Sequence, residues 1–528
     1  MTKSNFSRRE FLEMSAAAAG GSIAARNVLL AQEPAPAPGK RVAASDTVRF
    51  GMIGVGMQGS GLLGNSIHLP GVECAGAADL YDGRHTLARE IVRPDLPVTR
   101  RYRDLLDNKN IDCIVAAVPD HWHRQVVIDA VSAGKDIYCE KPMSHTPADG
   151  VAMVDAAKKA GRIVQIGSQR VSSQVCAKAK QIIAQGSLGD LMLVEGSMGR
   201  NDPCGAWQYP PPFDLSPATV DWDTWQGDVL PKRAFNPLLF ARWRCWKEYG
   251  TGVAGDLLVH LISGMMFMLG INQPPRYAAA VGGIRHWKDG RNMPDVHGAV
   301  YYFGDLPVYM RLNLATETPE VYRIQGSKGL LEVTGSSVSF TPQLGVDTYP
   351  CYYTGSFPRA MREQYEKQWH AENDEKLAKL PPQESIAYRM QDFDDTRPHL
   401  ANFFDAVRTR RPVVEDVVFG HHAALACHMA NESYFQKNSR HLGRGVQNDQ
   451  ACVTASGVSA PRWFAAPNAI EKVAGDEHYS AYYQRSGPNG HHRRELNTPR
   501  VHSRKDRDDE DGDSERHENA ADSHQSCN

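Results

Sequence analysis

Short apolar runs alternate with amphipathic segments over the first part of the chain. The runs are continuous, as is typical of strands buried on both faces, and they cover residues 48–53, 72–78, 111–118, 136–139 and 162–167. Apolar residues at helical spacing predict helices at residues 83–92, 101–108, 124–133 and 147–160. This alternation favours a parallel sheet with helices on both faces. We therefore predict a doubly wound α/β domain over residues 47–170.

The pattern changes after residue 170. Alternating apolar and polar positions with turn residues between them predict strands at residues 191–196, 275–282, 297–304, 308–315, 322–326, 329–334 and 337–341. Helical spacing predicts helices at residues 173–185, 397–408 and 421–436, and a charged helical insertion at 357–382. Residues 201–237 are rich in proline and tryptophan and read as a long loop. We predict an α+β domain over residues 171–440 with an open, largely antiparallel sheet.

The two ends of the chain differ from these domains. Residues 7–12 read S-R-R-E-F-L, which resembles the twin-arginine export signal of bacteria. The resemblance implies a signal peptide over residues 1–31, export by the twin-arginine machinery and a periplasmic location, with residues 32–46 as an extended Pro/Ala linker. The alternative is an amphipathic N-terminal helix with an incidental arginine pair. Residues 441–528 are polar and highly charged and are predicted to be disordered, either as a natural extension or as a frameshift product.

Composition excludes several classes of function. The chain has 528 residues and a net charge of −2, so no overall field favours nucleic acid or an anionic membrane. Its ten cysteines include no C-x-x-C pair, and we predict neither a disulfide framework nor a metal site. Beyond the N-terminal segment no apolar run is long enough to span a bilayer.

A glycine-rich turn follows the first predicted strand. Residues 54–59 read G-V-G-M-Q-G, which is G-x-G-x-x-G directly after a strand and at the start of a helix. Glycines permit the tight turn, the approach of backbone to a pyrophosphate and close helix–strand packing, while the helix N-terminus attracts the phosphates. This pattern predicts a Rossmann dinucleotide-binding domain. The candidate cofactor-binding residues of the turn are Gly54, Gly56, Met57, Gln58 and Gly59.

An acidic residue ends the second predicted strand. Asp79 follows the apolar run at residues 72–78, where a carboxylate can accept both ribose hydroxyls of an adenosine. The same carboxylate would repel a 2′-phosphate. The cofactor is therefore predicted to be NAD, with NADP less favoured. The alternative is a buried strand that ends in a surface aspartate.

Two further loops at strand ends carry a family resemblance. Residues 119–123 read P-D-H-W-H and residues 139–142 read C-E-K-P, and both are similar to loops of the Gfo/Idh/MocA oxidoreductases, the group of glucose–fructose oxidoreductase and inositol dehydrogenase. The resemblance covers residues 48–435. It implies that Lys141 lies beside the nicotinamide and the reacting carbinol, and that the peptide before the proline is often cis. The alternative is a surface Lys141 paired with Glu140. The implied cofactor-binding residues are Pro119, His121, His123, Glu140 and Lys141.

A second candidate motif lies in the other domain. Asp256 and His260 are four residues apart in an apolar segment that reads as a helix, so they share one face. Burial perturbs the pKa values of both groups, and a neutral imidazole could take a hydroxyl proton while Asp256 orients the ring or binds a sugar hydroxyl. The spacing is similar to the D-x-x-x-H motif of the family, although Ser263 stands where an acid is usual. The alternative is a core histidine.

The tryptophans of the long loop have two possible roles. Residues 221–225 read D-W-D-T-W and are similar to a segment of secreted members of the family. Such tryptophans can stack on sugars, but we favour anchoring of the loop to the core.

These observations give three hypotheses of function. The first is an exported NAD(P)-dependent oxidoreductase that acts on a sugar, polyol or glycoside and uses Lys141, Asp256 and His260 as catalytic residues. The second is a glycosidase or lyase that recycles a tightly bound NAD, similar to NAD-dependent α-N-acetylgalactosaminidases of the family. The third is a sugar-binding protein without catalysis, which the intact motifs argue against. The family resemblance also implies a homo-oligomer.

Overall fold

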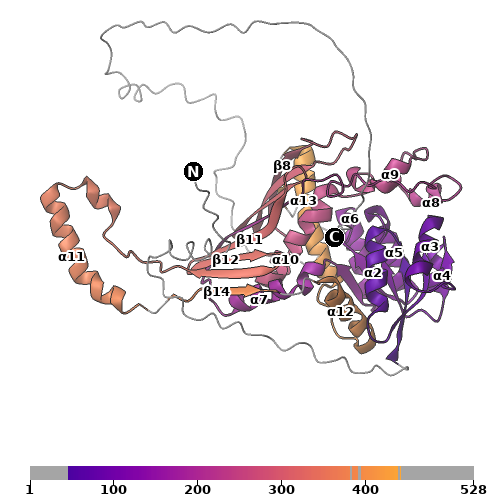
Figure 1. Ribbon diagram of the computed structural model, residues 1–528, viewed down its shortest axis with the longest axis horizontal. Coiled ribbons are helices and arrows are strands. Elements are labelled where there is room, and N and C mark those ends of the chain that lie inside the picture. Colours follow the sequence, from indigo (N-terminus) through magenta and orange to yellow (C-terminus); the bar gives the residue numbers. More distant parts are fainter. Residues whose placement is uncertain (1–45, 381–382, 391–393, 438–439, 442–528) are drawn as a thin grey trace, which may run out of the picture. The chain divides into compact units, whose positions relative to one another are not determined.

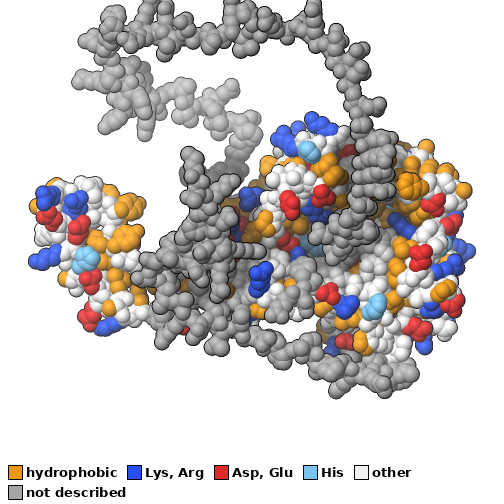
Figure 2. Space-filling view, in the orientation of Figure 1, with side chains coloured by type: hydrophobic (Ala, Val, Ile, Leu, Met, Phe, Trp, Pro, Cys, Tyr) orange, Lys and Arg blue, Asp and Glu red, His pale blue; other side chains and the backbone are white. Residues whose placement is uncertain are grey.

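The computed structural model describes residues 46–380, 383–390 and 394–437, together with the backbone of Arg440–His441. The predicted signal peptide, nearly all of the linker and the predicted tail after residue 441 lie outside the described residues. Within the described part of the chain, no helix combines the length and apolar character needed to cross a membrane. Figure 2 shows acidic and basic side chains intermingled on the visible face of the described residues.

The first domain is a Rossmann fold, as predicted (Figure 1). Its six-stranded sheet has the order β3-β2-β1-β4-β5-β6, and every neighbouring pair is parallel. The strands are β1 Val48–Ile53, β2 Val72–Ala78, β3 Val98–Thr99, β4 Cys113–Ala116, β5 Asp136–Glu140 and β6 Val164–Gly167. The helices are α2 Met57–Ile67, α3 Asp82–Ile91, α4 Tyr102–Asp107, α5 Asp120–Ser132 and α6 Pro147–Ala160.

One boundary in this domain bears on the site. Helix α5 begins at Asp120, four residues before the predicted start at residue 124. Pro119 is its N-cap residue, and the negative charge of Asp120 suits the first turn of a helix. His121 and His123 therefore lie on a helix rather than in a loop, with side-chain directions fixed by the helix.

The second domain contains a nine-stranded mixed sheet of order β14-β13-β12-β11-β7-β10-β9-β8-β15. The strands are β7 Leu191–Gly199, β8 Tyr277–Gly283, β9 Val296–Phe303, β10 Leu306–Asn313, β11 Thr318–Gly326, β12 Gly329–Thr334, β13 Ser337–Pro342, β14 Ile386–Arg389 and β15 Arg440–His441. All pairs are antiparallel except β7 with β10, which confirms the largely antiparallel prediction. Strands β14 and β15 are too short for their pattern to have predicted them.

Helices cover one face of this sheet. The helical elements of the second domain are η2 Gln169–Ser172, α7 Gln174–Ala184, α8 Trp222–Trp225, α9 Pro237–Ala241, η3 Trp243–Cys245, η4 Ala254–Leu258, α10 Val259–Leu269, η5 Tyr352–Ser356, α11 Arg359–Ala378, α12 Thr396–Thr409 and α13 Val417–Gln436. Buried residues of α7, α10 and α13 form one core with alternate residues of the strands. On the other face Val300, Tyr302 and Tyr309 are exposed.

The last helices return to the first domain. Leu400, Phe403 and Phe404 of α12 belong to the hydrophobic core around β1, where the rings of Phe50 and Phe404 are 5.5 Å apart. At the start of α13, Asp416 forms a backbone bridge with Gln165 of β6. The two domains therefore share core residues, although the sequence pattern divides them at residue 170.

Candidate active site

The glycine-rich turn has the geometry that its spacing predicts. Gly54 has a φ of +84°, and a Cβ there would lie 2.4 Å from the carbonyl oxygen of Ala117. A Cβ on Gly59 would lie 2.0 Å from the carbonyl oxygen of Gly54, so only glycine lets α2 pack this closely on the turn. Gly56 is the N-cap of α2 and no side chain caps the helix there. Its first amide groups can therefore bind an anion.

The other two residues of the turn differ in environment. The side chain of Met57 is 59% exposed. Gln58 points to the sheet, where its Nε2 donates to Oε1 of Glu140 at 3.0 Å. This hydrogen bond joins the start of α2 to the end of β5.

Asp79 is held rigidly at the end of β2. One carboxylate oxygen accepts the backbone N–H of Val55 at 2.8 Å, and the other accepts that of Tyr81 at 3.0 Å. The guanidinium of Arg84 lies 3.4 Å from Asp79 Oδ2 and also stacks over the ring of Phe240 at 5.0 Å. Asp79 thus places a fixed negative charge beside the glycine-rich turn, and Arg84 is a neighbour that the sequence pattern did not identify.

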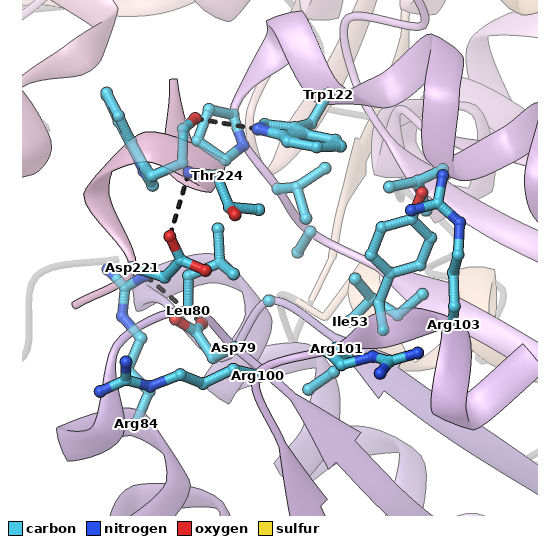
Figure 3. Close-up of a pocket in the computed structure, with 18 residues that line it drawn as sticks. Ile53, Asp79, Leu80, Arg84, Arg100, Arg101, Arg103, Trp122, Asp221 and Thr224 are labelled. Carbon is cyan, nitrogen blue, oxygen red and sulfur yellow. Dashed lines mark hydrogen bonds and ion pairs between the residues drawn. The ribbon is translucent and has the colours of Figure 1, made fainter. Parts of the chain in front are cut away.

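A cavity of about 280 Å³ opens at the carboxyl ends of β1, β2 and β4 (Figure 3). This is the point where the strand order reverses, the usual ligand site of a doubly wound sheet. In the view, Asp79, Asp221 and Arg84 lie on one side of the cavity and Arg103 lies on the other. The lining residues include Gly54, Asp79 and Pro119 of the predicted cofactor site, together with Asp221, Thr224 and Trp225 from the second domain.

A segment of the long loop, residues 214–226, closes one side of this cavity, and we call it the strap. Backbone hydrogen bonds fix it to the first domain: Asp221 N donates to Leu80 O at 3.0 Å, and Asp82 N donates to Thr219 O at 3.0 Å. The Nε1 of Trp122 donates to Trp225 O at 2.9 Å.

The strap also carries its own aromatic anchor. Trp222 and Trp225 stack at 4.8 Å and are 7% and 4% exposed. Both therefore pack mainly in the interior, as favoured by the anchoring hypothesis, and Trp225 also lines the cavity.

The two predicted histidines of α5 hold neighbouring backbone. Nε2 of His121 lies 2.9 Å from Trp225 O and Nδ1 lies 3.2 Å from Tyr249 O. Burial lowers the pKa of His121 to about 4, so the neutral ring donates to one of these two carbonyl oxygens. His123 is fully buried and contacts Pro142 O at 2.7 Å and Val118 O at 2.9 Å. His121 thus fixes the strap, and His123 fixes the turn that follows Lys141.

Lys141 lies between the two domains. Its Nζ donates to the carbonyl oxygen of Asp256 at 2.8 Å and to Oδ1 of the same residue at 3.0 Å. The side chains of Lys141 and Asp256 are each 11% exposed. The peptide bond between Lys141 and Pro142 is cis, as the resemblance implied. The alternative of an exposed lysine paired with Glu140 is therefore wrong.

Arg244 makes a second ion pair with the same carboxylate. Its Nε lies 3.0 Å from Asp256 Oδ1. Burial alone would raise the pKa of Asp256, but the charges of Lys141 and Arg244 outweigh it and hold the pKa well below its usual range. Asp256 is therefore ionised at neutral pH.

A π-helical turn carries Asp256. The turn η4 precedes α10, on which His260 lies, and such turns are frequent at functional sites. Burial, together with the positive charges of Lys141 and Arg170, holds the pKa of His260 well below its ordinary value, so the imidazole is neutral. Among the described residues, the His260 ring has no hydrogen-bond partner. Asp256 thus holds Lys141 rather than orienting the His260 ring, which corrects one of the two roles suggested for it.

Glu140 links the site to the glycine-rich turn. Its carboxylate accepts from Gln58, from Gln169 Nε2 at 2.8 Å and from the backbone N–H of Lys141 at 3.2 Å. Burial raises the pKa of Glu140, and these donors together with the charge of Lys141 oppose that shift. These hydrogen bonds to Glu140 fix the position of the Lys141 backbone.

Sequence reasoning missed Arg244, Arg84 and the covering role of the strap. Arg244 lies in a tryptophan-rich segment just before the Asp256 motif. An arginine in such an apolar segment is expected to be buried and therefore to need an acidic partner, which is the signal that could have identified it. Arg84 is five residues after Asp79, beside the expected ribose site.

Comparison with known proteins agrees with this geometry. Residues 48–168 match the Gfo/Idh/MocA family described as an oxidoreductase family with an NAD-binding Rossmann fold. The chain is 31% identical over 152 residues to inositol 2-dehydrogenase of Salmonella typhimurium, covering 28% of this chain and 45% of that protein. It is 29% identical over 256 residues to a glycosyl hydrolase family 109 protein of Shewanella baltica, covering 44% and 54%. The chain spans about half the length of the curated relatives it matches.

Solved structures share the whole two-domain fold. A levoglucosan dehydrogenase in complex with NADH and levoglucosan has a TM-score of 0.54 at 18% identity, over 75% of this chain and 100% of that one. An aldose–aldose oxidoreductase from Caulobacter crescentus gives a TM-score of 0.54 at 16% identity with the same coverage. At this identity the likeness concerns the fold. Residues 48–168 therefore form a Rossmann domain that is similar to the NAD-binding domain of the Gfo/Idh/MocA oxidoreductase family.

Proposed function

We propose that this protein is an NAD-dependent oxidoreductase that transfers a hydride between a secondary carbinol of a sugar, polyol or glycoside and nicotinamide. The observation that carries the proposal is the buried Lys141–Asp256 pair beside the neutral His260. Lys141 directly follows Glu140, whose carboxylate accepts a hydrogen bond from Gln58 at the start of α2. The matched family and the inositol dehydrogenase relative support the same class of reaction.

The first domain fits the cofactor. The turn at Gly54 and Gly59 leaves no room for side chains, the N-terminus of α2 offers free amide groups, and Asp79 presents a carboxylate for ribose hydroxyls. Bound NAD would supply the acceptor for the hydride that leaves the carbinol carbon. The negative charge of Asp79 favours NAD over NADP.

The chain's own residues handle the proton. Oxidation of a carbinol removes a hydride from carbon and a proton from oxygen, leaving a carbonyl. A neutral His260 can accept that proton, and the Lys141 ammonium can donate a hydrogen bond to the oxygen while negative charge develops on it. Asp256 holds the ammonium through two hydrogen bonds. In the reverse direction the same groups return the proton to the oxygen.

Turnover with a substrate panel tests this proposal. Purified protein is incubated with NAD or NADP and with sugars, polyols and aryl glycosides, while the absorbance of reduced nicotinamide and the products are followed. We expect reduced cofactor and a carbonyl product in equal amounts. Absence of both nicotinamide binding and product would instead support a non-catalytic sugar-binding protein.

A second candidate is a glycosidase or lyase that keeps its NAD bound and recycles it. The strap over the cavity favours retention of the cofactor, and the family 109 glycosyl hydrolases among the relatives support this class. Transient removal of a hydride at a ring carbon would acidify the neighbouring C–H, and loss of that proton would expel the aglycone and leave a double bond. Return of the hydride would then give net elimination, whereas addition of water to the double bond before the hydride returns would give net hydrolysis. Product formation without accumulation of reduced cofactor distinguishes this candidate.

We further propose export through the twin-arginine pathway and assembly into a homo-oligomer. The arginine pair near the N-terminus supports export, and the exposed apolar side chains Val300, Tyr302 and Tyr309 on the open face of the sheet support self-association. Cell fractionation of wild type and of a variant with Arg8→Lys and Arg9→Lys tests export. Light scattering of the purified protein tests assembly.

A further inference from the structure

We infer that the substrate of this site carries a carboxylate, so that the enzyme acts on acidic sugars such as hexuronates or their glycosides. This inference rests on the proposed function and specifies its substrate class. Arg244 is the residue that would bind the carboxylate.

Arg244 is only partly used by the protein. It lies on η3, its guanidinium stacks on the ring of Trp243 at 4.2 Å, and its side chain is 18% exposed. Nε donates to Asp256 Oδ1, whereas within the described part of the chain the two terminal nitrogens have no hydrogen-bond partner. Neither nitrogen is fully enclosed by the protein, so both face accessible space. A planar guanidinium with two unused amino groups is suited to bidentate binding of a carboxylate.

Arg170, another arginine near the site, has its charge balanced by acidic partners. The guanidinium of Arg170 contacts Glu320 at 2.5 Å and Asp395 at 2.8 Å, so two carboxylates balance one cation. Among the described residues Arg244 forms an ion pair with Asp256 alone, and it shares Oδ1 of that residue with Lys141. Two cations therefore depend on one carboxylate.

A third cation lies near this pair. Arg200 follows the end of β7, and its charge contributes to lowering the pKa values of both Asp256 and His260, which places it within electrostatic reach of the site. The carboxylate of Asp120 also acts on Arg244, but it already accepts Thr251 N and Thr251 Oγ1 at 2.9 and 2.6 Å. With His260 neutral, the three cations Lys141, Arg244 and Arg200 face the acids Asp256, Asp120 and Glu140, and Glu140 already accepts from Gln58, Gln169 and the backbone of Lys141.

An anionic substrate would balance this charge. Positive charges in a partly buried site lose hydration, and hydroxyl groups of a neutral sugar cannot neutralise them. The oxidised nicotinamide ring would add a further positive charge at the reacting carbon. A carboxylate on the sugar would neutralise one charge and satisfy the two open nitrogens of Arg244 at once.

Matched neutral and acidic substrates test the inference. Initial rates are measured with glucose against glucuronate and with galactose against galacturonate, as free sugars and as aryl glycosides, using the full-length protein with NAD. We expect kcat/KM to be at least about tenfold higher for the acidic member of a pair, since hydrogen bonds to charged groups are the stronger ones. A wild-type protein that prefers the neutral member would overturn the inference while the proposed function stands. If no member yields product or reduced cofactor, both are overturned.

Two variants separate substrate binding from support of Asp256. Arg244→Gln should lower kcat/KM at least about tenfold for acidic sugars and much less for neutral ones, so the preference disappears. Arg276→Gln, which removes an exposed arginine paired with Asp305 in the turn between β9 and β10, should leave both values unchanged. Equal losses for both members in Arg244→Gln would show that Arg244 acts only through Asp256 and would overturn the inference. The wild-type comparison decides the question even if Arg244→Gln does not fold.

Discussion

Lys141 and Asp256 come from different domains and are joined twice, because Lys141 Nζ lies 2.8 Å from the Asp256 carbonyl oxygen and 3.0 Å from Oδ1. The contact therefore closes the two domains on each other and sets the position of the ammonium at the same time. A π-helical turn around Asp256 displays both oxygens to a single donor. Loss of one partner would leave a buried charge on the other, so the pair is sensitive to any change that separates the domains.

Lys141→Met should remove most of the activity and leave the fold intact. The substitution keeps the length of the side chain but removes the donor that stabilises developing charge on the substrate oxygen, and Arg244 still pairs with Asp256. We expect kcat to fall by roughly a hundredfold or more, with NAD affinity nearly unchanged. Steady-state kinetics and NAD titration measure both. As a control, Lys141→Arg keeps the charge and should retain the melting temperature of the wild type. Full activity in Lys141→Met would exclude the proposed role of Lys141.

Asp79→Asn should relax the preference for NAD. The amide oxygen can still accept one of the two backbone N–H groups that Asp79 accepts, from Val55 and Tyr81. The negative charge is removed and Arg84 is released to meet a 2′-phosphate. We expect the ratio of kcat/KM for NAD over NADP to fall by roughly tenfold to a hundredfold. Asp95→Asn, at an exposed position paired with Arg93, is the control, and an unchanged ratio in Asp79→Asn would contradict this role of Asp79.

Loosening the strap should speed release of the cofactor. Trp225→Leu removes the stack with Trp222 and lines the cavity with a smaller side chain. The backbone hydrogen bonds at Leu80 and Asp82 remain, so the strap stays attached but less firmly. NAD should dissociate severalfold faster, as measured by displacement of fluorescent reduced cofactor. Trp369→Leu on α11 is the matched control, because no residue of that described helix is buried. Equal dissociation rates in all three proteins would argue against retention by the strap.

Stability should fall as the pH decreases from about 6.5 to about 4. Burial lowers the pKa values of His297 and His399 to about 4, whereas an unfolded histidine titrates near 6.5. In that window the unfolded chain binds more protons than the folded one, so the free energy of unfolding decreases with decreasing pH. Both ring nitrogens of His297 lack partners among the described residues.

His297→Leu should make this pH dependence shallower. The apolar side chain fills the same buried position, and it has no proton to bind in either state. Melting temperatures across the window measure the slope. His370→Leu, at an exposed position on α11, should keep the wild-type slope. The same slope in His297→Leu would assign the acid sensitivity to other groups.

Local pattern predicted the elements and part of the site. Continuous apolar runs identified β1, and helical spacing identified α6 with the observed limits. The G-x-G-x-x-G spacing placed Gly54 and Gly59 correctly, because their conformations depend on contacts within one turn.

Pairing between distant segments could not be predicted from such patterns. Periodicity shows that a residue is buried and does not show which partner it meets. Arg244 of η3 pairs with Asp256 of the π-helical turn η4, and Phe404 of α12 enters the core of the first domain. The parallel pairing of β7 with β10 has the same origin, since alternation fixes the face of a strand and not its direction.

Two glycines on one helix offer a sharp test of the cofactor turn. A Cβ at Gly59 would lie 2.0 Å from the carbonyl oxygen of Gly54, so Gly59→Ala must push α2 away from the turn. A Cβ at Gly61, two residues along the same helix, would meet no described heavy atom within 4 Å. Gly61→Ala should therefore be neutral or stabilise the protein by up to about 1 kcal/mol, because alanine favours helix.

The effects of the two substitutions should be opposite. Gly59→Ala is expected to destabilise the fold by about 1–3 kcal/mol and to weaken NAD binding by at least roughly tenfold, because the amide groups at the start of α2 move with the helix. Thermal melts with and without NAD measure both effects, since bound cofactor raises the melting temperature of a protein that can hold it. If NAD raised the melting temperature of Gly59→Ala as much as that of Gly61→Ala, the cofactor would not depend on the close packing of α2 against the glycine-rich turn.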